Sequence, residues 1–239
     1  MSRTKIDWCD SVWNPVWGCL HGCSFCYARK FAGRFYKTVA RANGLSSEDT
    51  ERLKNFQPVF LPKNFARRFS KGERVIFVNS MSDPAFWKED WIEKVIERIK
   101  QEPERIFLFL TKAPAGYGKF PERLPPNLWL GVSATNGREL SERVEQLRRV
   151  SNTANLFVSL EPLLEEIADP EPLRTFRWVI VGPQTGNLQR KLRQRYERNF
   201  SSWLERIEGY CRESGTALFE KEACGRYKGN LVREFPFRR

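Results

Sequence analysis

Short apolar runs alternate with amphipathic stretches along most of this chain, and this alternation constrains its fold more than any other feature. Residues 91–100, 139–150 and about 200–213 have the spacing of amphipathic helices. The apolar runs, which read as buried strands, lie at 75–78, 106–110, 128–132, 156–160, 178–181 and 217–219. Strands separated by helices of this length predict right-handed crossovers and a parallel sheet.

We expect an α/β fold, a partial (β/α) barrel of about six parallel strands. A probable first strand near 12–17 precedes a loop rich in cysteine. A complete eight-fold barrel needs about 250 residues, and this chain has 239. Residues 41–72 show no strand pattern and carry many cations, so we interpret them as a basic insertion with helical pieces. Because no Gly/Ser-rich linker interrupts the chain, residues 1–239 are expected to form a single domain.

Composition limits the class of protein. Hydrophobic residues make up 41% of the chain, enough for a packed core, which argues against disorder. No segment approaches the roughly 20 apolar residues that span a bilayer, and the N-terminus has no apolar signal stretch. We therefore expect a soluble, cytoplasmic protein without a membrane partner.

The net charge of +12 favours a polyanionic partner such as DNA or RNA. The alternative is the charged surface of a thermophilic protein. Ion-pair networks account for many charges of both signs, but they do not account for a surplus of one sign.

Three of the six cysteines, Cys19, Cys23 and Cys26, fall within eight residues. Clustered thiols in a cytosolic chain indicate metal or redox chemistry, because such chains seldom use disulfides. Three local thiolates suit one iron–sulfur cubane and leave one iron open. That iron is able to chelate S-adenosylmethionine. Two alternatives remain: a structural zinc site with Cys9 or His21 as fourth ligand, and cysteines that bind no metal.

The Cys-x3-Cys-x-Phe-Cys motif resembles the signature of the radical S-adenosylmethionine superfamily. More narrowly, the chain resembles an uncharacterised phage- and prokaryote-associated family of radical-SAM-like proteins. The segments that carry this resemblance are Trp8 to Tyr27, Val78 to Asp83, Trp129 to Ser133 and Ser159 to Leu163. It implies a [4Fe–4S] cluster, S-adenosyl-L-methionine cleaved to a 5′-deoxyadenosyl radical, and an electron donor such as ferredoxin or flavodoxin. It also places Phe25 and Tyr27 beside the cofactor.

The turn after the strand at 75–78 carries four polar residues: Asn79, Ser80, Ser82 and Asp83. The resemblance places this turn at the methionine amine of the cofactor. The Gly-Gly-Glu sequence common elsewhere in the superfamily is absent here. The alternative role is structural, an Asx-type turn in which Asp83 caps the helix that begins at Pro84.

Three later strand ends also carry candidate cofactor contacts. Ser133 suits a ribose or carboxylate contact, and Glu161 suits ribose hydroxyls or an arginine. A buried ion pair is the structural alternative for Glu161. Gly182 lies in a turn that resembles the one packed against adenine in the superfamily.

Two basic stretches interleave cations with Phe65, Phe69 and Tyr196, a pattern that suits phosphate pairing and base stacking. Their candidate nucleic-acid contacts are Lys63, Arg67, Arg68, Lys71, Arg190, Lys191, Arg193 and Arg195. The alternative is a solvated helix face whose aromatic residues anchor it to the core.

Three further cysteines, Cys9, Cys211 and Cys224, suit buried core positions. A hydrogen-atom donor or a ligand to a second cluster is the alternative role. The leading hypothesis is a radical enzyme that modifies or repairs nucleic acid. The others are a non-catalytic nucleic-acid-binding protein with a structural Fe–S or zinc site, and a radical enzyme that acts on a small molecule or a protein.

Overall fold

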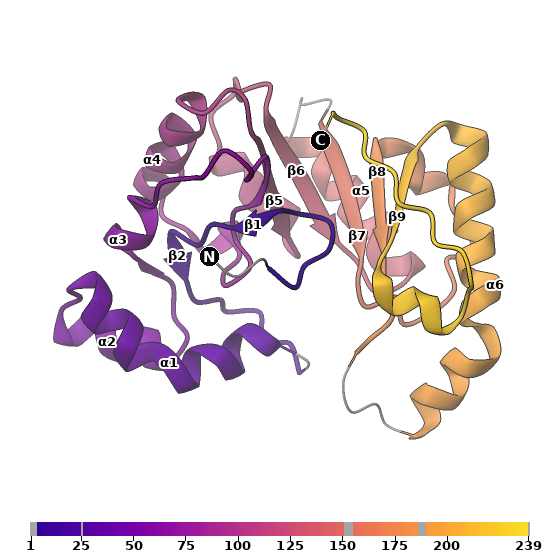
Figure 1. Ribbon diagram of the computed structural model, residues 1–239, viewed down its shortest axis with the longest axis horizontal. Helices are drawn as coiled ribbons and strands as arrows, with labels where there is room; N and C mark the ends of the chain where they lie inside the picture. Colours follow the sequence, from indigo (N-terminus) through magenta and orange to yellow (C-terminus); the bar gives the residue numbers. More distant parts are fainter. Residues whose placement is uncertain (1–3, 25, 151–154, 186–189, 239) are drawn as a thin grey trace. The chain divides into compact units, whose positions relative to one another are not determined.

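The computed structural model describes residues 4–24, 26–150, 155–185 and 190–238, and the chain forms two compact units (Figure 1). The first unit extends to Trp129 and the second begins at Leu130. This boundary falls inside strand β6 (Leu128–Ser133). No linker marks it in the sequence.

The first unit contains three parallel strands in the order β1 (Ser11–Val12), β4 (Val75–Phe77) and β5 (Ile106–Thr111). Helix α4 (Glu89–Lys100) connects β4 to β5 and buries four aliphatic side chains on one face. Two short 3₁₀ helices follow these strands, η1 (Pro84–Phe86) after β4 and η2 (Pro114–Lys119) after β5. The polar turn 79–83 therefore lies at the carboxyl end of β4, where parallel α/β folds place their ligands.

A second group of elements in this unit surrounds its longest helix, α1 (Tyr27–Asn43). Strand β2 (Val16–Trp17) pairs antiparallel with β3 (Val59–Phe60). In the sequence, helix α2 (Ser47–Lys54) precedes β3 and helix α3 (Pro62–Phe65) follows it. Trp17, Leu53 and Phe56 form a hydrophobic cluster with alanines of α1. Small residues on α1 allow this close packing.

The second unit has four parallel strands in the order β6, β7 (Leu156–Leu160), β8 (Trp178–Val181) and β9 (Ala217–Glu220). Strands β7 and β8 are buried along their whole length, as expected when helices cover a parallel sheet. Its helices are α5 (Gly137–Val150) and α6 (Arg190–Ser214), with 3₁₀ helices η3 (Glu171–Thr175) and η4 (Glu222–Arg226).

The alternation of parallel strands with helices confirms the predicted fold class, a partial β/α barrel, with seven parallel strands among the described residues in place of about six. Three details differ from the expectation. The predicted strand at 12–17 is two strands, β1 and β2, because Pro15 interrupts it. The insertion at 41–72 contains β3, which is only two residues long. Helix α6 begins at Arg190, about ten residues before the predicted start.

Within the ranges that the structure describes, no helix is both long enough and apolar enough to cross a membrane.

Candidate functional site: the cysteine loop and the turn after strand β4

The cysteine loop connects β2 to α1, and two glycines shape its backbone. Gly18 has φ of 111° and Gly22 has φ of 67°, conformations that other residues rarely adopt. A side chain at position 18 would also collide with the backbone of Gln57, since an added Cβ lies 2.1 Å from its carbonyl oxygen. Two hydrogen bonds hold the start of the loop: Gly18 N donates to Met81 O at 3.0 Å, and Cys19 N donates to Phe56 O at 2.9 Å.

The three thiols of the loop are partly exposed, and none forms a disulfide. Cys19 and Cys26 pack against the hydrophobic cluster under α1. Burial raises the pKa of the Cys19 thiol to about 12, and the nearby charges of Asp83, Cys23 and Cys26 add to the rise. Cys26 is the N-cap of α1, where its Sγ accepts a hydrogen bond from Arg29 N at 3.3 Å.

The donor set fits an iron–sulfur cluster, because thiolates are the usual ligands of such clusters and all three thiols belong to one glycine-shaped loop. In the described part of the chain, no three His, Cys, Asp or Glu side chains stand close enough together to hold a metal ion as they are placed. Ligation by all three cysteines would thus require side-chain rearrangement within the loop. Phe25 lies outside the described residues.

The turn after β4 packs directly against the cysteine loop. Gly18 and Ser82 form an isolated parallel bridge. His21, in the middle of the loop, donates from Nε2 to the carboxylate of Asp83 at 2.8 Å. Tyr27, at the first position of α1, donates its hydroxyl to Ser80 O at 2.8 Å. Both ends and the middle of the loop are therefore fixed to one turn.

Asp83 is buried, and both of its carboxylate oxygens are fully used. Oδ1 accepts from Ala85 N at 3.0 Å and from the Thr111 hydroxyl at 2.6 Å. Oδ2 accepts from His21 and from Lys112 N, the latter at 2.9 Å. The predicted structural role, a cap before Pro84, is therefore confirmed. Asp83 also connects the ends of β4 and β5 to the loop.

The other predicted contacts of this turn also have partners within the protein. Asn79 is buried and exchanges hydrogen bonds with the backbone of Leu110 on β5. The Ser80 hydroxyl bonds with the side chain of Asn14, and the Ser82 hydroxyl accepts from Trp87 Nε1 at 3.1 Å. These hydrogen bonds hold the turn in place. Because all of them are made within the protein, cofactor contact by Asn79, Ser80 and Ser82 stays a prediction.

Sequence reasoning missed the network of His21, Asp83 and Thr111. His21 is the single histidine of the chain, and its place between two candidate ligands was the available signal. Its partner lies 62 residues away.

In the second unit, the predicted cofactor contacts lie at the carboxyl ends of three neighbouring strands. Ser133 is buried at the end of β6, in register with Ser159 on β7. Glu161 forms an ion pair with Lys221, as in the structural alternative considered for it, although the pair is only partly buried. The stem of Lys221 also packs beside Gly182, where an added Cβ would lie 3.0 Å from it. Lys221 therefore joins the ends of β7 and β8.

The two basic stretches turn their aromatic residues toward the protein. Phe65 and Phe69 contact the ring of buried Trp13 at centroid distances of 6.0 and 5.5 Å. Tyr196 is fully buried and donates to Leu163 O. Arg67 is only partly exposed and is paired with Glu73. The exposed cations are Lys63, Arg68, Lys71, Arg190, Lys191, Arg193 and Arg195. The aromatic residues therefore anchor these stretches to the protein, and nucleic-acid contact by the exposed cations stays a prediction.

The remaining cysteines are buried, as favoured from the sequence. Cys9, Cys211 and Cys224 are at most 4% exposed, and none forms a disulfide. Burial raises the pKa of both Cys211 and Cys224 to about 12.

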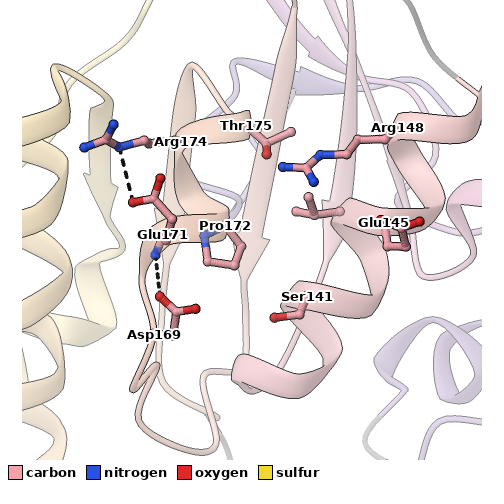
Figure 2. A pocket seen from close by; sticks show the side chains of 9 residues that line it. Ser141, Glu145, Arg148, Asp169, Glu171, Pro172, Arg174 and Thr175 are labelled. Atoms are coloured by element: carbon pink, nitrogen blue, oxygen red, sulfur yellow. Dashed lines mark hydrogen bonds and ion pairs between the residues drawn. The ribbon is translucent and has the colours of Figure 1, made fainter.

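One pocket of about 240 Å³ lies in the second unit between α5 and η3 (Figure 2). It is smaller than typical ligand pockets, which start near 300 Å³. Several of its charged groups already have partners: Glu171 pairs with Arg174 at 3.4 Å, and Asp169 accepts from the Glu171 backbone. None of the residues predicted to bind a cofactor or nucleic acid lines it.

The fold and the site define an α/β protein of parallel strands with a three-cysteine loop bound to a strand-end turn. The chain belongs to the family described as protein of unknown function (DUF5131), whose model matches residues 3–234. No curated protein and no solved structure matches it.

Proposed function

We propose that this protein is a radical S-adenosylmethionine enzyme in which Cys19, Cys23 and Cys26 hold a [4Fe–4S] cluster. When bound, the cluster and S-adenosylmethionine supply reductive cleavage to a 5′-deoxyadenosyl radical that abstracts hydrogen from substrate. The substrate class that the charge favours is nucleic acid, and the proposed reaction is modification or repair. The proposed setting is the cytoplasm, where thiols stay reduced, with a ferredoxin or flavodoxin as electron donor.

One observation carries this proposal: three reduced thiols lie in a single loop that is fixed to the polar turn after a parallel strand. A structural zinc site would have no need of such a turn. Parallel α/β proteins bind ligands at the carboxyl ends of strands. The contact between the loop and the turn thus brings the three thiols close to the polar groups at the end of β4.

The residues of the chain have distinct tasks in this proposal. The three cysteines supply thiolate ligands. Asp83 and His21 hold the loop, so that its ligands keep a fixed position next to β4 and β5. Tyr27 fixes the start of α1 to the turn. The backbone and side chains of residues 79–82 line the turn and are the proposed contacts for the amino acid end of S-adenosylmethionine.

Anaerobic reconstitution with iron and sulfide tests the proposal. We expect about four irons per chain, an electron paramagnetic resonance signal of a reduced cubane, and 5′-deoxyadenosine from S-adenosylmethionine after reduction. Cys23→Ala should lose all three readouts. We choose Cys23 because Cys26 also caps a helix and Cys19 packs against the core.

Cys211→Ala is the matched control, because it also removes one thiol, from a buried position in the second unit. It should keep the iron content of the wild type. A protein that binds one zinc ion per chain and forms no cubane would disprove the proposal. So would a cubane that persists in full in Cys23→Ala.

A further inference from the structure

An aromatic stripe runs along the exposed side of α1. Tyr27, Phe31 and Phe35 are 60%, 46% and 41% exposed. Successive members are four residues apart, so they lie on one face of the helix. The Phe31 and Phe35 rings touch at a centroid distance of 4.5 Å. A contiguous exposed patch of apolar side chains commonly marks an interaction site.

This stripe is separate from the packing face of α1. The residues that α1 buries are Ala28, Ala32, Ala40 and Asn43, and these alanines contact the hydrophobic cluster of the first unit. Phe31 reaches only the edge of that cluster, at 5.8 Å from the Trp17 ring. The helix therefore has its core contacts without the stripe, and folding does not require three aromatic rings on the outer side.

A row of cations lies next to the stripe. Lys30, Arg34, Lys37 and Arg41 are all exposed and follow the same helical spacing of four, three and four residues. In the part of the chain that the structure describes, no carboxylate pairs with any of these four. Between Asp10 and Glu48 the sequence contains five cations and no acidic residue. This side of the unit is thus positively charged as well as aromatic.

The stripe begins at the cysteine loop. Tyr27 directly follows Cys26, the N-cap of α1, and its hydroxyl bonds to the turn at Ser80. A chain lying along the stripe would therefore have one end at the candidate metal site. Leu20 within the loop is also 56% exposed.

We propose that this face of α1 binds single-stranded nucleic acid, with bases stacked on Phe31 and Phe35 and phosphates paired with the adjacent cations. Aromatic side chains beside cations are how sequence-tolerant single-strand sites work. This inference deepens the proposed function, since it rests on the cysteine loop as the reacting centre and assigns the substrate class. The row of unpaired cations repels a second copy of the same face. The Phe31 and Phe35 rings are about half covered by the protein. They therefore present a surface on which a base can stack, but they project too little to insert into a lipid layer.

The test measures binding of a fluorescent 20-nucleotide single strand, as DNA and as RNA, to the full-length protein by anisotropy. Stacking contributes about 1–3 kcal/mol per base, or roughly 5- to 150-fold in affinity. The Phe31→Ala/Phe35→Ala variant should therefore weaken binding at least about 30-fold. Phe35→Ala alone, which leaves the contact between Phe31 and Trp17 in place, should weaken it at least about 5-fold.

Two comparisons separate stacking from charge. Phe35→Trp keeps a stacking surface and should restore affinity, and an abasic strand should bind wild type and Phe35→Ala equally. Arg34→Gln/Lys37→Gln should reduce the slope of log affinity against log salt by about 1.4, because each single-strand phosphate contact contributes roughly 0.7. Arg123→Gln/Arg226→Gln, a matched loss of two exposed cations that are not among the candidate nucleic-acid contacts, should leave that slope nearly unchanged.

The same binding is measured on the Cys211→Ala protein, whose lost thiol is buried in the second unit and which should bind strands like wild type. A protein that binds strands but produces no 5′-deoxyadenosine would refute the enzyme proposal alone. Equal binding by wild type and both phenylalanine variants would refute the present inference alone. The present inference would also be refuted if Phe31 and Phe35 were needed for binding to anionic phosphatidylserine vesicles but not for binding to single strands.

Discussion

Replacement of Asp83 by alanine is the perturbation whose effect the structure defines most closely. The carboxylate is buried and accepts four hydrogen bonds, from His21, Ala85, Thr111 and Lys112. Two of these donors are backbone N–H groups, those of Ala85 and Lys112. The substitution therefore removes a charge and leaves buried donors unsatisfied.

The magnitude follows from these contacts. A hydrogen bond to a charged group contributes about 1.5–3 kcal/mol, and each buried donor left without a partner costs about 1–3 kcal/mol. Because contributions within one network are not additive, we expect Asp83→Ala to lower the free energy of unfolding by about 3–5 kcal/mol. Asp83→Asn keeps the volume and one acceptor oxygen, and should lose about 1–2 kcal/mol.

Urea unfolding followed by tryptophan fluorescence measures this loss as a shift in midpoint. Hydrogen exchange at the amides of Ala85 and Lys112 reports where the loss arises, and both amides should exchange faster in Asp83→Ala. The control is Glu97→Ala on α4, whose ion pair with Lys100 is at least half exposed and should contribute no more than about 1 kcal/mol. An Asp83→Ala protein within about 0.5 kcal/mol of wild type would show that the network does not stabilise the unit.

Three further predictions concern glycine contacts and buried thiols. Gly18→Ala should lower iron content after reconstitution, whereas Gly209→Ala, with open space around it, should not. Gly131→Ala would place a Cβ 2.3 Å from an aromatic ring of β7 and should lower stability by about 1–3 kcal/mol in thermal unfolding. The pKa values of Cys211 and Cys224 rise from 9.0 to about 12 on folding. As the pH rises, these thiols therefore lose their protons in the unfolded chain before they do so in the folded protein. The free energy of unfolding should fall between pH 9 and 12, by up to about 1.4 kcal/mol per pH unit for each thiol. Cys224→Ala should make that fall shallower in urea titrations at each pH.

The strands β4 to β9 were predictable because each is a short apolar run. Strand β7 is buried at every position, and its five residues read Leu-Phe-Val-Ser-Leu. Helix α6 was placed too late because its first turns are almost entirely cationic. The signal for its earlier start was present, since Tyr196 precedes Phe200 by four residues and both are fully buried.

The site was predictable only where it is local in sequence. The cysteine spacing identified the loop, and the strand-end rule identified the turn after β4. Which side chains hold the two together was not predictable, because His21 and Asp83 are 62 residues apart and their pairing depends on the tertiary fold. The boundary between the two compact units has no signal in the sequence, because it lies inside a strand.

The position of Cys26 as the N-cap of α1 bears on why this residue is a cysteine. A helix is best begun by Ser, Thr, Asp or Asn, whose oxygen accepts strongly from the backbone, whereas sulfur is a weak acceptor. Cys26 occupies this position with a bond of 3.3 Å to Arg29 N. The cap alone would therefore be better served by serine, and Cys26→Ser should keep the helix while it removes the sulfur. Cap strength thus does not explain the cysteine at this position, whereas its packing against the hydrophobic cluster and its proposed ligation of iron both do.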